Sequence, residues 1–205
     1  MMKKKVIAAF LLIAAVVGVI SANVIATDKL THDVDRIKKN ISEIDHLDRE
    51  VLAKVGEKEI SNIDVAKYIT FNNHFDQAVK LSEETVLGTL ISEELFYQEA
   101  VNSGFGVSLE DAIEEANKNR TFLERESENT LKTHAKLLEI MNIGNEQYWN
   151  ELVPLEYQKT IALQKYTDYL IMEGKINFDG TDIGSVGQQL QQYKNNLFAK
   201  YLENS

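Results

Sequence analysis

The chain contains no cysteine and only one proline among its 205 residues. Without cysteine it has no disulfide, no thiolate nucleophile and no cysteine to carry a lipid, so packing has to supply its stability. The single proline, Pro154, favours a helix-dominated domain because proline breaks helices beyond their first turn. The ten glycines lie singly, and the sequence has no glycine-rich phosphate loop and no Gly-x-Ser-x-Gly motif.

The few histidines are dispersed, and none has a second histidine four residues further on, as a His-Glu-x-x-His metal helix requires. They are His32, His46, His74 and His134. The segment "KINFDGTDIGSV", residues 175–186, resembles the middle of a calcium loop, but Lys175 stands at the first ligand position and Val186 at the last. Adjacent acidic pairs such as Glu93–Glu94 do not face each other on a helix. We expect no metal site, no cofactor and no catalytic constellation.

An uncharged apolar run, "VIAAFLLIAAVVGVISANVIA", occupies residues 6–26 and follows three lysines at positions 3–5. A basic flank before an apolar run is typical of a segment that enters the membrane with its N-terminus inside. The run is long enough to span a bilayer, and alanines near its end offer sites for signal-peptide cleavage. Residues 1–27 are therefore predicted to be a signal peptide or a membrane anchor. Both alternatives place the rest of the chain outside the cytoplasm, either anchored at the outer face of the cytoplasmic membrane or secreted into the cell envelope.

The charge of the chain is strongly acidic, with 32 acidic and 22 basic residues. Removing residues 1–26 takes away three basic residues and no acidic one, which leaves a net charge of −13. Such a surface repels phosphate backbones and anionic lipid headgroups, so no nucleic acid is expected as a partner. An acidic surface favours solubility and tolerates basic clients.

Residues 28–50 carry apolar side chains at steps of four and three along the chain. These are Leu30, Val34, Ile37, Ile41 and Ile44. The pattern extends over about two heptads, which is shorter than a coiled coil usually needs. It predicts a linker helix with a narrow apolar stripe; the alternative is a stalk that forms a homodimer through residues 30–44.

Residues 51–61, "VLAKVGEKEIS", alternate like a strand, turn at Gly56 and then alternate again, which predicts a small β-hairpin. Nearly everything after them has helical periodicity. Ser82 and Ser108 are followed by acidic residues, as expected for N-caps before the first turns of helices. The predicted fold class is mainly α with one hairpin.

Two blocks of this region resemble the SurA/PrsA group of extracytoplasmic chaperones. "VLAKVGEKEISNIDVAKYI", residues 51–69, is similar to the opening of that family, where a short hairpin leads into the first helix. "LISEELFYQEAVNSGFGVSLEDAIEEA", residues 90–116, resembles its second-helix pattern of acidic pair, Gln-Glu-Ala, glycine stop and Val-Ser. The resemblance implies a helical SurA N-terminal-like domain over residues 51–205, with a last helix, about residues 184–203, that packs back on it.

The chain departs from the family by lacking a parvulin-type prolyl isomerase domain. It has no His-Ile-Leu strand opening and no Gly-Gly-x-Leu-Gly segment. About ten residues separate Gly174 from the last helix, where family members commonly carry the isomerase. The resemblance therefore implies no enzyme activity. In the family the hairpin commonly pairs with a strand near the C-terminus, and Lys175–Phe178 is the predicted partner strand here.

The predicted function is that of a chaperone that binds unfolded or extended polypeptide segments through an apolar groove between helices. The candidate groove residues are aromatic: Phe71, Phe75, Phe96, Tyr97, Tyr148, Trp149 and Tyr157. For each of them the alternative is packing in the core, and Tyr148–Trp149, before the break at Pro154, is the pair most expected at the surface. A second hypothesis is a membrane-tethered adaptor that binds one dedicated envelope partner. A degenerate prolyl isomerase ranks third.

Overall fold

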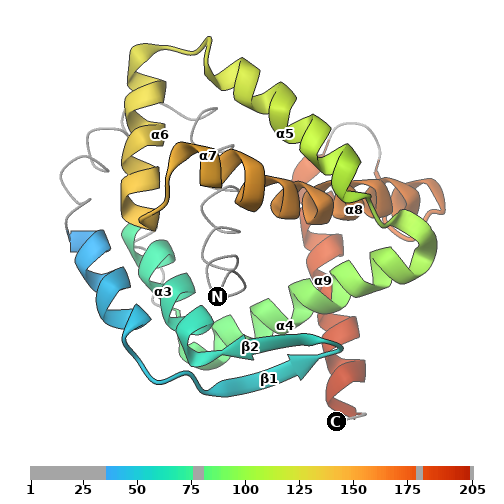
Figure 1. Ribbon diagram of the computed structural model, residues 1–205. Helices are drawn as coiled ribbons and strands as arrows, with labels where there is room; N and C mark the ends of the chain where they lie inside the picture. Colours follow the sequence, from blue (N-terminus) through green and yellow to red (C-terminus); the bar gives the residue numbers. More distant parts are fainter. Residues whose placement is uncertain (1–35, 76–80, 179–181, 204–205) are drawn as a thin grey trace.

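The computed structural model describes residues 36–75, 81–178 and 182–203 (Figure 1). This part of the chain is mainly helical with one small β-hairpin, which confirms the coarse fold class. No helix within these ranges has the length and apolar content that a membrane span requires. The predicted signal or anchor segment, residues 1–27, lies outside the described residues.

A helix over residues 36–45 precedes the hairpin, and the remaining helices follow it. Two π-helical turns extend or introduce longer helices: Val101–Phe105 continues α4, and Tyr148–Leu152 leads into α8. The labelled elements are β1 (Val51–Val55), β2 (Lys58–Ser61), α3 (Asn62–Phe75), α4 (Glu83–Ala100), α5 (Leu109–Leu123), α6 (Glu128–Met141), α7 (Asn145–Gln147), α8 (Val153–Met172) and α9 (Ile183–Glu203).

The helices begin where short polar side chains bind their free backbone N–H groups. The Ser82 hydroxyl accepts a hydrogen bond from the Thr85 N–H at 3.1 Å, and Ser108 accepts one from the Asp111 N–H at 3.0 Å. Both predicted N-caps are therefore confirmed. Ser127 caps α6 in the same way.

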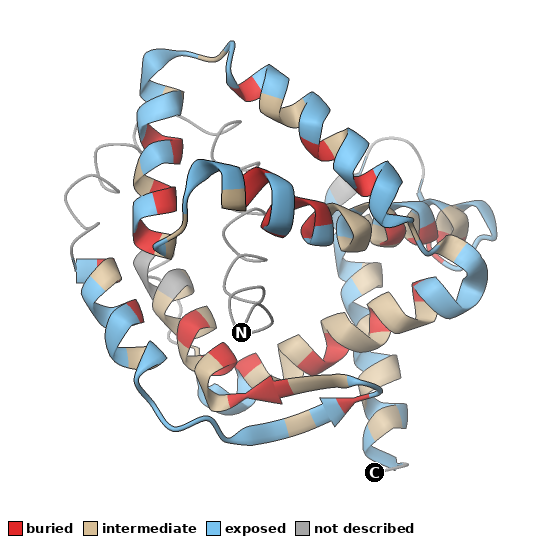
Figure 2. Ribbon diagram, viewed as in Figure 1, coloured by how far each residue is buried: buried red, intermediate tan, exposed pale blue. Residues whose placement is uncertain are grey.

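Four apolar clusters hold the helices together. One joins the hairpin to α3, α4 and α9 through Val55, Ile60 and Val86. A second joins α4, α8 and α9 around Phe96 and Tyr166. The other two connect α6 with the turn before α8 and with the helix over residues 36–45. Figure 2 shows the resulting pattern on the hairpin, where β1 is largely exposed and β2 ends in buried residues.

The hairpin is held by helices. Its two antiparallel strands are the whole sheet within the described part of the chain. The Gln98 side-chain amide of α4 donates a hydrogen bond to the Val55 carbonyl at 2.8 Å. The Tyr201 hydroxyl of α9 donates to the Lys54 carbonyl at 2.9 Å. Helix α9 crosses α4, and its C-terminal end thereby reaches β1 (Figure 1).

The prediction that Lys175–Phe178 pairs with the hairpin is wrong, because these residues form no strand. They close the C-terminus of α8 instead. Gly174 adopts a φ of +67°, and the N–H groups of Lys175 and Ile176 both donate to the Leu170 carbonyl, at 2.9 and 3.1 Å. Ile176 is buried beside Leu170 in the cluster between α4, α8 and α9. The N–H groups of Lys175 and Ile176 thus cap α8, while the Asn177 N–H and carbonyl bind the side chain of Gln189 on α9.

Part of the apolar stripe predicted for residues 28–50 lies in the described residues, and this part packs against another helix of the same chain. Ile37 and Ile41 are buried against Leu137 and Ile140 of α6. Leu30 and Val34, the other end of the stripe, lie outside the described residues. The stripe over residues 36–45 therefore has an intramolecular partner. A homodimer through residues 30–44 stays a prediction, and it would require this contact to open.

Replacing Gln98 with leucine tests the attachment of the hairpin to α4. We expect Gln98→Leu to lower the free energy of unfolding by about 1–2 kcal/mol, because the Val55 carbonyl loses its donor. Gln191→Leu on the exposed side of α9 is the control, since Gln191 bonds only to a neighbour on its own helix. Urea unfolding followed by circular dichroism measures both. Equal stability of the two variants would contradict the proposed attachment.

Candidate functional site

The five aromatic candidates whose side chains the structure describes do not gather into one groove. Among these five, only Tyr97 lines a surface hollow beside the hairpin. Phe96 is 1% exposed and its ring packs 5.4 Å from that of Tyr166, so it belongs to the core. Tyr157 is half-buried against the cluster that contains Trp149. The side chains of Phe71 and Phe75 lie outside the described part of the structure.

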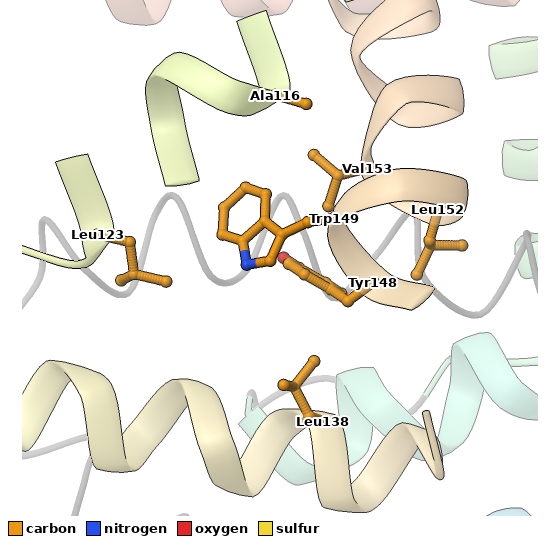
Figure 3. Close-up of a cluster of buried hydrophobic side chains, with 7 residues drawn as sticks. All are labelled: Ala116, Leu123, Leu138, Tyr148, Trp149, Leu152 and Val153. Carbon is orange, nitrogen blue, oxygen red and sulfur yellow. The ribbon is translucent and has the colours of Figure 1, made fainter. Parts of the chain in front are cut away.

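The expectation that Tyr148 and Trp149 are accessible at the surface is wrong. Tyr148 is 4% exposed and Trp149 is 7% exposed. The π-helical turn Tyr148–Leu152 carries both rings into the space between α5 and α6, where they meet edge to face with centroids 5.0 Å apart. Figure 3 shows them among their neighbours from three helices, which are Ala116, Leu123, Leu138, Leu152 and Val153. Both side chains are therefore core residues, which was the alternative prediction for them.

His134 of α6 completes this aromatic cluster. Its ring centroid lies 5.0 Å from that of Tyr148 and 5.8 Å from that of Trp149. The side chain is buried, and its Nε2 atom has no hydrogen-bond partner among the described residues. Burial lowers the pKa of His134 because the charged imidazolium is poorly solvated there. His134 is therefore a neutral packing residue whose protonation opposes the contact between α6 and the Tyr148–Leu152 turn.

The surface hollow has a volume of about 540 Å³ and lies between the hairpin turn and the C-terminal half of α4. Its lining residues come from the turn and from α4 with the π-helical turn that follows: Gly56, Glu57, Lys58, Glu94, Tyr97, Gln98, Val101 and Asn102. Gly56 makes the turn close to α4, with a φ of +55°, and a Cβ atom there would lie 2.9 Å from the Gln98 Oε1 atom. The positive φ favours glycine here, and a side chain would displace the Gln98 amide.

Lys58 is the cation in the lining of the hollow. It is half-buried, and its ammonium forms no hydrogen bond or ion pair with any described residue. Burial lowers the pKa of Lys58, although the nearby carboxylates of Glu94 and Asp64 act in the opposite direction. An ammonium in this state favours contact with an anionic or polar group that enters the hollow.

Behind this lining, α8 contributes two charged side chains. The Lys159 ammonium lies 3.6 Å from Glu94 Oε2 and 5.5 Å from the centroid of the Tyr97 ring. Glu156 is 3% exposed, and burial raises its pKa to about 8, against the opposing effects of Lys159 and Lys58. At neutral pH Glu156 therefore keeps its proton and adds no negative charge to the site.

Sequence reasoning missed this charged group, although a signal for it exists in α8. The inward-facing stripe of α8 and the turn before it follows steps of four and three residues, with Leu152, Glu156, Tyr166 and Leu170 buried and with Lys159 and Leu163 half-buried. Two charged residues thus occupy positions where the periodicity calls for apolar ones. Such a conflict between local pattern and burial is typical of functional or specially compensated positions.

The arrangement offers binding contacts: an apolar wall from Tyr97 and Val101, amide groups from Gln98 and Asn102, and a half-buried ammonium from Lys58. Within the ranges that the structure describes, no three histidine, aspartate or glutamate side chains gather where they would hold a metal ion. The hollow is accordingly the candidate functional site of the described domain.

His134 makes the free energy of unfolding depend on pH. Because its folded-state pKa is lowered, the unfolded chain binds a proton that the folded chain resists, so stability is lost as pH falls below about 6.5. We expect His134→Phe to lose less stability than the unaltered chain between pH 7 and pH 5. The exposed His46→Gln variant is the control. Urea unfolding at the two pH values measures the stability lost by each chain. If His134→Phe loses as much stability as the unaltered chain, this role of His134 is contradicted.

Glu156 has the opposite dependence. Its folded-state pKa is raised from 4.5 to about 8, so the folded chain keeps a proton that the unfolded chain releases, and stability falls as pH rises between these values. Glu156→Gln, a neutral replacement, should be more stable than the unaltered chain at pH 7 by on the order of 3 kcal/mol, at about 1.4 kcal/mol per pKa unit.

This gain should vanish near pH 4.5, and exposed Glu151→Gln should show no comparable gain. Thermal unfolding at several pH values measures it. A gain that does not depend on pH would show that Glu156 is ionised in the folded chain.

No protein-family profile, curated protein or solved structure matches the chain. The resemblance to the SurA/PrsA chaperones accordingly depends on the motifs in residues 51–69 and 90–116.

Proposed function

We propose that the chain is an extracytoplasmic, chaperone-like protein that binds extended polypeptide segments in the hollow between the hairpin turn and α4. The observation that carries this proposal is where the two motif blocks lie in space. Residues 51–69 and 90–116 carry the resemblance to the SurA/PrsA chaperones, and every residue that lines the hollow falls within one of them. The two blocks meet through the bond from Gln98 to the Val55 carbonyl.

The dimensions and lining of the hollow suit part of an extended chain. A volume of about 540 Å³ is within the range of small-ligand pockets and accommodates one or two side chains. Tyr97 and Val101 supply apolar contact, and 40% of the Val101 surface is exposed. The Asn102 amide is able to bind a peptide backbone, and so is the Gln98 Oε1 atom, since the Gln98 NH2 group already donates to Val55 and Glu94. Backbone contacts of this kind tolerate many client sequences.

The charge of the chain fits the same role. A net charge of −10 for the whole sequence keeps a complex with an apolar client soluble and attracts basic segments over a distance of several ångströms. Binding needs neither a nucleotide nor a metal ion in this proposal. The membrane-tethered adaptor remains the competing hypothesis, and it predicts that unfolded clients are ignored.

An aggregation assay tests the proposal. The full-length chain, kept in solution by a non-ionic detergent, is added while a chemically denatured client enzyme is diluted into buffer, and light scattering is followed against a detergent-only blank. We expect suppression at near-stoichiometric ratios. Val101→Ser combined with Tyr97→Ala should remove most of it, because both side chains form the apolar wall.

Met172→Ser is the matched control, since Met172 is an exposed apolar residue of α8 outside the hollow. Circular dichroism verifies that each variant is folded. Scattering that stays unchanged at a large excess of the unaltered chain would refute general chaperone activity and favour the adaptor. Equal suppression by the double variant and the control would place client binding elsewhere on the surface.

A further inference from the structure

The charged groups around the hollow differ in whether they have a hydrogen-bond or ion-pair partner. The Lys58 ammonium lines the hollow and forms no hydrogen bond or ion pair with the described residues, although the Glu94 and Asp64 carboxylates lie near enough to act on its charge. A half-buried cation without a partner is unfavourable, because the protein replaces part of its water shell without returning a hydrogen bond. A ligand that brings an anion to Lys58 would supply that missing interaction.

The carboxylates nearest to Lys58 already have partners. Asp64 Oδ2 accepts hydrogen bonds from the N–H and the hydroxyl of Ser61, both at 2.8 Å. Glu94 accepts a hydrogen bond from the Gln98 amide at 3.0 Å and lies 3.6 Å from the Lys159 ammonium. Neither of these carboxylates forms an ion pair with Lys58.

The remaining acidic groups oppose an incoming anion only weakly. Glu156 is buried behind the lining and stays protonated below about pH 8, since burial raises its pKa. Glu57 lies at the exposed rim, where water screens its charge. Lys159 pairs with Glu94, and the Asp64 carboxylate is held by Ser61. Lys58 is thus a cation in the lining without an ion pair to any described residue, on a protein whose sequence carries an overall charge of −10.

We propose that Lys58 binds a carboxylate of the polypeptide held in the hollow, so that the site prefers segments with a carboxylate next to an apolar side chain. This inference rests on the proposed function. The carboxylate fits beside the Lys58 ammonium, and the neighbouring apolar side chain fits against Tyr97 and Val101. A chain end and an aspartate or glutamate side chain present the same chemistry, and the experiment below separates these two sources.

The test uses three versions of one fluorescently labelled hexapeptide of serine, glycine and valine, each titrated with the full-length chain and followed by fluorescence anisotropy. The first ends in a free carboxylate, the second in a neutral amide, and the third in the amide but with one internal aspartate. We expect one or both carboxylate-bearing peptides to bind about tenfold more tightly than the neutral amide, which corresponds to about 1.4 kcal/mol. The tighter of the two identifies the source.

Lys58→Gln should remove this preference, so that the three peptides bind the variant with similar affinities. Lys132→Gln is the matched control, because Lys132 is an exposed lysine of α6 that pairs with its own helix neighbour Glu128. Equal binding of all three peptides to the unaltered chain overturns the carboxylate inference without recourse to any variant. If no peptide binds while the aggregation assay still shows suppression, the inference fails and the proposed function stands. If suppression is also absent, both fail.

Discussion

The contact between the Gly56 turn and the Gln98 side chain fixes the hairpin on α4, and most of the remaining packing depends on where α4 lies. A two-stranded hairpin is marginal by itself in water. Here Gln98 donates to the Val55 carbonyl, and the turn lies so close to the helix that a Cβ atom at Gly56 would meet the Gln98 amide. The same helix presents Phe96 to α8 and α9. One helix therefore positions the sheet, the central core and the wall of the hollow.

Helix α8 places charge where its periodicity calls for apolar side chains. Glu156 and Lys159 lie on its inner stripe, and Lys58 approaches them from β2. With Glu156 protonated at neutral pH, the Lys58 and Lys159 ammonium groups face the Glu94 and Asp64 carboxylates, and only Lys159 forms an ion pair, with Glu94. Buried ionisable groups commonly lower the stability of a fold, and proteins retain them where a binding site uses them. The hollow beside the hairpin is the nearby site where these groups would act in binding.

Features set by a few neighbouring residues were predictable from the sequence. Ser82 and Ser108 cap their helices because a hydroxyl followed by an acidic turn satisfies the first N–H groups locally. Features that depend on which helix faces which were not predictable. Tyr148 and Trp149 turn inward because α5 and α6 leave space for them. The backbone of Lys175 and Ile176 caps α8 instead of pairing with β1. The charged group behind the hollow, around Glu156, forms only when α8 meets β2 and α4.

The bond from Tyr201 to the Lys54 carbonyl joins residues 147 positions apart. Phe198 and Tyr201 also belong to the cluster that buries Val55 and Ile60. The hairpin is synthesised well before α9, the helix that completes its core. Contacts of such long sequence separation form late in folding, because a long loop must close before they are gained. The core beneath the hairpin is therefore completed only after α9 has been translated. Until α9 packs, the newly made domain is incompletely packed.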